Sequence, residues 1–324
     1  NPAPEVLENL VAAGLTGFDV ASPEEIAQVR AASATADLHY NNPVRTRREI
    51  AVGKAANVRS WSVDDMSELA KLGAAVRAGE EVAVRFKLPV KGAHYDFGAK
   101  FGATPDVAVA LLKAVAASGY RPALTFHPGT QCAEPEAWVA YIAAAADIAA
   151  RADVKLARLN VGGGFASHRE GAAPNLERVF GAISAAVREH FVTPPKLVCE
   201  PGRAMVAESF TLATKVKALR ADGSVFLNDG IYGSFAEWRD ISALTRLRVL
   251  SETGAEKTGR EQARTVFGPT CDSIDCLPEP VHLPLDIGEG DYLMFAGMGA
   301  YSLAIATRFN GYGLRKVITV QRFR

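Results

Sequence analysis

The sequence predicts an α/β domain followed by an all-β domain, and three observations support this order. Over the first two-thirds of the chain, short β-branched or apolar runs alternate with alanine-rich segments of helical composition, which is typical of βαβ units around a parallel sheet. After about Ala204 this alternation gives way to β-patterned runs such as FTLATKVKAL, VFLN, TRLRVL and VITVQRF. Gly, Asp and Pro turns separate these runs. We therefore expect domains at 1–204 and 205–324.

The first domain has seven strand candidates, each separated from the next by a helical segment. They are Gly17–Ala21, Asp37–Tyr40, Val58–Val63, Glu81–Leu88, Pro122–His127, Leu156–Val161 and Lys196–Glu200. A closed (β/α)₈ barrel of the TIM type has eight such strands, so one is expected outside the given sequence.

The beginning of the chain indicates where that strand lies. Asn1-Pro2-Ala3-Pro4 precedes EVLENLVAAGL, and prolines in a first turn mark the start of a helix. A helix in this pattern follows a strand, so we expect the first barrel strand immediately before Asn1. Barrel active sites are built at such strand-to-helix junctions.

Composition restricts the class of partner. The chain has 324 residues, 48% of them hydrophobic, 22% charged and with no net charge, as in ordinary globular proteins. No global field attracts nucleic acid or an anionic membrane, and no apolar run reaches the roughly 20 residues of a membrane span. The four cysteines show neither zinc-site spacing nor a preceding secretory leader. We expect a cytoplasmic protein that binds small molecules and copies of itself, without a metal.

Two neighbouring strand ends carry a candidate anion site. Asn160-Val161-Gly162-Gly163-Gly164-Phe165 ends one strand with three glycines, whose bare backbone lets a phosphate approach the amide N–H groups. Glu200-Pro201-Gly202-Arg203 ends the next strand, and a guanidinium binds phosphate through two parallel hydrogen bonds. A flexible turn and a simple Glu200–Arg203 salt bridge are the structural alternatives.

Six motifs in order along the chain carry a specific resemblance. FDVASPEE, FHPGTQ, NVGGGF, CEPGR, FGPTCDSID and MGAYSLAIATRFNGY resemble the alanine-racemase-fold group of pyridoxal-phosphate decarboxylases that act on basic amino acids, the group that includes ornithine decarboxylase. The likeness extends from Asn1 to about Val320. It departs from the family at His-Pro-Gly-Thr, where a Val and a Ser are usual. It also lacks the first strand, which in the family ends in the cofactor-binding lysine two residues ahead of the position of Asn1.

The resemblance implies pyridoxal 5'-phosphate as cofactor and assigns residues to it. Glu200 matches the carboxylate that faces the pyridine nitrogen, and His127 matches the imidazole stacked on the ring. The other implied cofactor residues fall into a phosphate-binding set and a set of charged positions at or beside the cofactor. The phosphate set is Thr130, Gly162, Gly163, Gly164, Arg203 and Tyr301, the charged positions are Asp19, Glu25, Arg85 and Lys100, and Gly202 is a further cofactor-binding position.

The resemblance also assigns residues to the substrate. Cys271 matches the acid that returns a proton to Cα after CO₂ leaves, because a thiol with an ordinary pKa of about 8.5 keeps its proton at neutral pH. Asp272 matches the carboxylate that binds the distal ammonium of the substrate. Tyr232, Asp240 and Phe309 belong to the same implied pocket, and Arg239 beside Asp240 leaves the length of the substrate open.

The implied activity is decarboxylation of L-ornithine to putrescine, with L-lysine as a second substrate, in polyamine biosynthesis. Alternatives within the family act on lysine, diaminopimelate or a carboxylated polyamine, and a non-catalytic regulatory homologue is the alternative from another class. The resemblance further implies a homodimer, in which the loop with Cys271 and Asp272 completes the active site of the other subunit.

Overall fold

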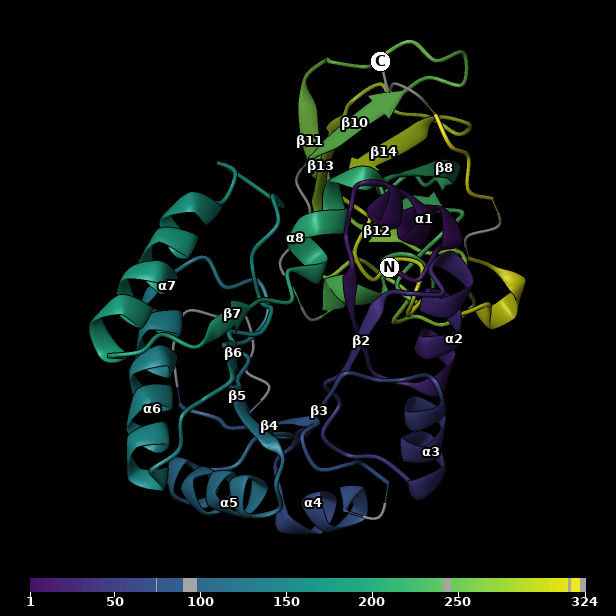
Figure 1. Cartoon of the computed structure of the whole chain (residues 1–324). Coiled ribbons are helices and arrows are strands. Elements are labelled where there is room, and N and C mark those ends of the chain that lie inside the picture. The colour runs from purple at the N-terminus through teal and green to yellow at the C-terminus, as the bar shows by residue number, and fades with distance from the viewer. Residues whose placement is uncertain (74, 90–97, 240, 242–245, 314–315, 321–324) are drawn as a thin grey trace. The chain divides into compact units, whose positions relative to one another are not determined.

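The computed structural model describes residues 1–73, 75–89, 98–239, 241, 246–313 and 316–320, and the chain divides into two compact units (Figure 1). The first, here called the α/β unit, comprises Pro2–Ala166 and Asn175–Gly202. The second, the β unit, comprises Asn1, Ser167–Pro174 and Arg203–Arg324. None of the helices in these described ranges is long and apolar enough to cross a lipid bilayer.

The α/β unit contains one sheet of seven parallel strands, each hydrogen-bonded to the next in chain order. All seven strands predicted from the sequence are present. They are β1 (Gly17–Val20), β2 (Asp37–Tyr40), β3 (Ser60–Val63), β4 (Glu81–Arg85), β5 (Arg121–Thr125), β6 (Arg158–Asn160) and β7 (Lys196–Val198). The sheet is curled, and Figure 1 shows the helices that follow its strands along the outer side.

The helices begin where the sequence supplies a cap or a proline. They are α1 (Pro4–Ala12), α2 (Pro23–Ala32), α3 (Arg47–Ala55), α4 (Met66–Leu72), α5 (Pro105–Ala117), α6 (Glu136–Ala152), α7 (Leu176–His190) and the short α8 (Gly202–Val206). Proline occupies the first turn of α1, α2 and α5, where no intrahelical donor is needed. Thr46 and Glu49 form a capping box that satisfies free N–H groups at the start of α3.

Several strands end earlier than their apolar runs predict, because turns take over the backbone. The run predicted over Pro122–His127 ends at Thr125, and the Gly129 N–H then donates to His127 Nδ1. The run predicted to reach Glu200 ends at Val198, and the Gly202 N–H donates back to the Glu200 carbonyl. The residues just after these strands therefore lie beyond the hydrogen-bonded part of the sheet, at its carboxyl edge.

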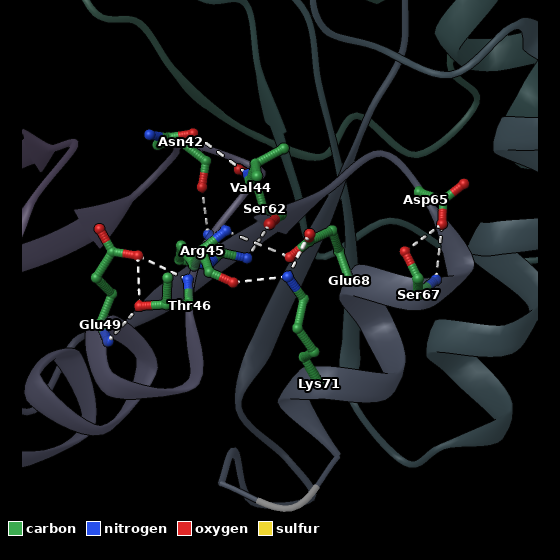
Figure 2. A network of polar contacts seen from close by, with 10 residues as sticks. All are labelled: Asn42, Val44, Arg45, Thr46, Glu49, Ser62, Asp65, Ser67, Glu68 and Lys71. Atoms are coloured by element: carbon green, nitrogen blue, oxygen red, sulfur yellow. Dashed lines mark hydrogen bonds and ion pairs between the residues drawn. The ribbon is translucent and has the colours of Figure 1, made fainter.

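A buried arginine fixes the segment between β2 and α3 (Figure 2). Arg45 is 2% exposed, and it donates to the carbonyls of Tyr40, Asn42 and Ser62. Its guanidinium carbon lies 5.2 Å from the ring centroid of Tyr40 and 5.5 Å from that of Trp61, within cation–π range. Desolvation lowers the pKa of Arg45 to about 10, so the group remains charged at neutral pH.

The β unit contains two sheets. The five-stranded sheet has the order β10 (Leu247–Leu250), β14 (Tyr292–Ala296), β8 (Thr211–Leu219), β9 (Val225–Leu227) and β12 (Val266–Phe267), and β11 (Glu261–Arg264) pairs with β13 (Val281–Pro284). Three 3₁₀ turns, η1 (Ala207–Ser209), η2 (Ala236–Arg239) and η3 (Phe309–Gly311), interrupt its loops. Apolar side chains such as Phe235, Leu293 and Phe295 form its buried core.

One β-patterned run of the β unit forms no strand over the part that the structure describes. The run VITVQRF begins at Val317, but the described residues 316–320 form no strand. Val317, Ile318 and Val320 are 46%, 66% and 54% exposed. A β-branched run becomes a strand only where a neighbouring edge accepts its hydrogen bonds, so composition alone was misleading here.

The Arg45 network predicts a large stability effect. Arg45→Met removes the donors of three carbonyls, two of them buried, and should lower the free energy of unfolding by about 3–5 kcal/mol, measured by chemical denaturation. The matched control is Arg59→Met, because the Arg59–Asp37 pair is 70% and 49% exposed and should contribute less than about 1 kcal/mol. Equal effects of the two substitutions would contradict this role for Arg45.

Candidate active site

Charged and polar side chains gather at the carboxyl edge of the parallel sheet. Asp19 belongs to β1 and Arg85 ends β4, whereas His127 and Glu200 follow β5 and β7 by two residues. Because all strands are parallel, these positions share one edge. Electrostatic coupling among Asp19, Glu200 and Arg85 agrees with this placement.

Glu200 is held by two asparagine side chains. Asn41 Nδ2 donates to Glu200 Oε1 at 2.6 Å, and Asn160 Nδ2 donates to the same oxygen at 2.5 Å. Desolvation by the surrounding protein raises the pKa of Glu200, while the bond from Asn160, the charge of Arg85 and the bond from Asn41 each lower it. The amides thus offset part of the cost of a carboxylate placed among protein atoms.

Asp19 is a second carboxylate at the same edge. Its pKa is raised well above the ordinary value, first by desolvation and then by the negative charges of Glu200 and Glu25. Hydrogen bonding from the Asn41 backbone and the charge of Arg85 oppose this rise. The Asp19 side chain is exposed by accessible surface and Glu200 is half-buried, so the protein atoms that surround them leave both carboxylates reachable from solvent. That combination is expected of side chains that line a concave surface.

His127 is a neutral imidazole under physiological conditions. Desolvation, followed by the charge of Arg85, lowers its pKa to about 3. The Gly129 N–H donates to Nδ1 at 3.1 Å, so the ring proton of the neutral form is on Nε2.

The glycine run packs too closely for any side chain. Gly162 and Gly164 have φ angles of +69° and +82°, which L residues rarely adopt. A Cβ on Gly163 would lie 2.6 Å from the Glu200 carbonyl oxygen and 3.1 Å from His127 Nε2. The Glu200 N–H donates to the Gly162 carbonyl at 2.8 Å. The backbone of the predicted phosphate cradle is therefore fixed directly beside Glu200 and His127.

Two charged positions assigned by resemblance have local partners in the α/β unit. Glu25 Oε2 accepts from the Ala21 N–H at 2.7 Å, a contact that closes the β1–α2 turn. Lys100 is exposed, and its Nζ lies 5.0 Å from the ring centroid of Phe101. Thr130 is buried, and Gly202 opens α8.

In the β unit, Arg203 pairs with Glu237. Both terminal nitrogens of the Arg203 guanidinium donate to the Glu237 carboxylate, which also forms an ion pair with the buried Arg169 at 3.4 Å. The guanidinium carbon of Arg203 lies 4.9 Å from the Tyr301 ring centroid. Arg203 thus has Glu237 as an ion-pair partner, while Glu200 is bonded to Asn41 and Asn160.

The predicted substrate residues of the β unit also come together. Tyr232 Oη donates to Asp272 Oδ2 at 2.6 Å, and the rings of Tyr232 and Phe309 lie 4.9 Å apart. Cys271 is exposed, and its Sγ lies 3.3 Å from Asn310 Oδ1. A shallow surface depression is lined by residues that include Tyr232, Thr270, Phe309 and Tyr312. Asp240 lies outside the described residues, as does the side chain of Arg239.

Sequence reasoning missed four residues of these clusters: Asn41, Asn160, Arg169 and Glu237. Asn160 stands inside the NVGGGF motif at a strand end, a position that could have marked it. The contacts of the other three join residues far apart in the chain, so no local pattern identified them.

Residues 1–207 match the family model described as the pyridoxal-binding domain of pyridoxal-dependent decarboxylases. The chain belongs to this decarboxylase family. It is 33% identical to the chloroplastic ornithine decarboxylase of Nicotiana glutinosa, a match that covers 98% of this chain and 76% of that relative. It is 32% identical to the lysine/ornithine decarboxylase of Selenomonas ruminantium, with 98% and 81% covered.

Among solved structures, the chain resembles the lysine/ornithine decarboxylase of Vibrio vulnificus complexed with putrescine. The TM-score is 0.84 at 27% identity, over 99% of this chain and 86% of that one. This decarboxylase chain uses pyridoxal phosphate as its cofactor. The residues at the strand ends fit pyridoxal phosphate. The glycine backbone is packed too closely to carry any side chain, and the Oε1 atom of Glu200 is held by two amides.

The low pKa of His127 predicts a pH-dependent stability. The unfolded chain takes up a proton on this group below about pH 6.5, but the folded chain does so only near pH 3. The contribution of His127 to the free energy of unfolding is therefore present above pH 6.5 and is lost as the pH falls toward 3. In the cofactor-free protein, the free energy of unfolding should fall less between pH 7 and pH 5 in His127→Gln than in the wild type. The expected difference is about 1 kcal/mol, after allowance for the partial exposure of His127.

Chemical denaturation at the two pH values measures this difference. His190→Gln, at an exposed position in the last turn of α7, serves as the matched control. A His127→Gln protein with the same pH dependence as the wild type would contradict the assignment.

Proposed function

We propose that this protein decarboxylates an amino acid with one distal ammonium group, L-ornithine in the first place and L-lysine in the second, to a diamine and CO₂. Support for the basic substrate comes from relatives named as ornithine and lysine/ornithine decarboxylases. The observation that carries the proposal in this chain is the orientation of Asp272 by Tyr232.

Asp272 suits an ammonium ligand. The bond from Tyr232, with that from the Ile274 N–H, lowers the pKa of Asp272, so the exposed carboxylate stays ionised at neutral pH. A charged hydrogen bond to a substrate ammonium contributes ~1.5–3 kcal/mol, and the same carboxylate disfavours acidic substrates. Phe309, packed on Tyr232, offers an apolar surface for the methylene chain of the substrate.

Each group at the sheet edge has a proposed role toward the cofactor. Bound pyridoxal phosphate supplies the electron sink that accepts the electron pair left when CO₂ departs. Glu200 faces the ring nitrogen, where its negative charge favours the protonated form of the ring. His127 packs its neutral imidazole against the ring.

The remaining cofactor roles concern the phosphate and the charged surroundings. The amides of Gly162–Gly164, with Thr130, Gly202, Arg203 and Tyr301, hold the phosphate. Asp19, Glu25 and Arg85 set the charge around the cofactor. After CO₂ has left, the Cys271 thiol donates the proton that Cα requires.

The complete assembly is also proposed from family likeness. The seven described strands of the sheet belong to a (β/α)₈ barrel whose remaining strand carries the cofactor-binding lysine. A homodimer supplies the Cys271 and Asp272 loop of one subunit to the other. Residues 1–204 form the cofactor domain, and residues 205–324 form the β domain.

The substrate prediction is tested by CO₂ release from ornithine, lysine, arginine and diaminopimelate in parallel with the full-length protein. We expect ornithine to give the highest kcat/KM, lysine a lower one and diaminopimelate the lowest, since its distal carboxylate meets Asp272. Turnover of neither ornithine nor lysine would refute the proposal. A protein that releases no CO₂ and binds no cofactor would instead support the non-catalytic alternative.

The proton-donor prediction is tested at Cys271. Cys271→Ala should leave cofactor binding intact but reduce formation of the diamine, because Cα is protonated slowly or the proton is delivered to the wrong atom. The measurement is the ratio of diamine to aminoaldehyde by-product, with Cys276→Ala, in the same loop, as the control. An unchanged ratio in Cys271→Ala would remove the thiol from the mechanism.

A further inference from the structure

Asn41 contacts Glu200 and also acts on the electrostatics of Asp19 at the carboxyl edge. Its side-chain Nδ2 donates to Glu200 Oε1 at 2.6 Å, and hydrogen bonding from its backbone lowers the pKa of Asp19. Asn41 lies just after β2, and 159 positions separate it from Glu200 in the chain. It therefore acts on both acids, whose like charges repel one another.

The orientation of the Asn41 amide is fixed by electrostatics. A flipped amide would place its oxygen against the Glu200 carboxylate, where acceptor would face acceptor. Asn41 is 8% exposed, and its Oδ1 has no hydrogen-bond partner among the residues that the structure describes. A buried acceptor without a partner costs free energy, so folding alone gives little reason for an amide here rather than a small apolar side chain.

The backbone around Asn41 is held rigidly. Arg45 Nη1 donates to the carbonyls on either side, those of Tyr40 at 3.0 Å and Asn42 at 2.5 Å. Ser62 Oγ donates to the Asn41 carbonyl at 2.6 Å. Figure 2 shows how the Arg45 guanidinium reaches this segment and Ser62 together. The rigid backbone directs the Asn41 amide at Glu200 before any ligand binds.

Asn160 acts on the same oxygen but is fixed differently. Its Oδ1 accepts from the Gly162 N–H at 2.9 Å, so the amide also holds the first glycine of the cradle. Substitution of Asn160 would disturb both the cradle and Glu200. Asn41 contacts Glu200 without contacting the glycines through any described hydrogen bond, which makes it the cleaner position to test.

The geometry points to Asn41 as a positioning residue, which directs Glu200 at the ring nitrogen of the cofactor and keeps its carboxylate charged. This inference rests on the ring-nitrogen role proposed above for Glu200. The negative charge of Glu200 then depends on the hydrogen bond that the Asn41 amide donates from the β2–α3 loop. Without that donor, Asn160, Arg85 and Arg158 are the groups among the described residues that still lower the pKa of Glu200 against the repulsion from Asp19.

The test compares two ligands with the full-length protein. One is pyridoxal phosphate, and the other is an analogue in which a C–H group replaces the ring nitrogen. Both carry the same phosphate, so a defect in the phosphate site weakens both equally. Binding is measured by equilibrium dialysis between pH 6 and pH 9, which requires no turnover.

We expect Asn41→Ala to weaken pyridoxal phosphate about tenfold at pH 7 and the analogue little, because one of two charged hydrogen bonds to Glu200 is lost. The loss should grow as the pH falls, since Glu200 then takes up a proton at a higher pH than in the wild type. His127 is neutral in this range, so its titration does not contribute to the change. The isosteric Asn41→Asp preserves packing but adds a third negative charge. It should lower the preference for pyridoxal phosphate over the analogue at least as much as Asn41→Ala does.

Asn42→Ala is the matched control, because Asn42 lies in the same loop and its side chain hydrogen-bonds, among the described residues, to the Ala21 carbonyl and the Val44 N–H and not to either carboxylate. It should retain the wild-type preference between the two ligands. Equal weakening of both ligands by Asn41→Ala, with a lowered melting temperature, would show a merely structural role and overturn the inference.

Glu200→Gln separates this inference from the proposed function. If Glu200→Gln abolishes the preference for pyridoxal phosphate while both Asn41 variants retain it, only the role of Asn41 fails. If Glu200→Gln itself retains the preference, the ring-nitrogen role of Glu200 fails and the inference falls with it.

Discussion

The negative charge of Glu200 is the feature on which the proposed chemistry depends, and two asparagine amides with Arg85 maintain it against desolvation and the nearby Asp19. A carboxylate crowded by protein loses hydration, and a second acid beside it adds repulsion. The amides offset these costs at a single oxygen, Oε1. The rest of the α/β unit can be understood as the framework that brings these groups to one edge.

That framework follows from parallel pairing. Strands β2, β6 and β7 are distant in sequence, yet their carboxyl ends place Asn41, Asn160 and Glu200 within hydrogen-bonding distance. The Arg45 network adds local rigidity where the chain leaves β2. In the β unit, Tyr232 performs a comparable task for Asp272, because its hydroxyl fixes the carboxylate that we assign to the substrate.

The sequence predicted the strands of the sheet because each β-branched run is bounded by turn residues, and this local signal needs no partner. It identified Glu200, His127 and the glycine run because they lie directly after those strands. It missed Asn41 and Glu237, whose importance arises from contacts 159 and 34 positions away. It also predicted a strand at VITVQRF, where the described residues find no edge to pair with. Local composition reports propensity, whereas partners and electrostatic balance depend on the folded chain.

The most direct test of the central claim is an experimental structure of the full-length protein with pyridoxal phosphate bound. The account predicts the ring nitrogen within hydrogen-bonding distance of the Glu200 carboxylate, the His127 imidazole against the ring and the phosphate on the Gly162–Gly164 amides. A cofactor bound with its ring nitrogen directed away from Glu200 would contradict it.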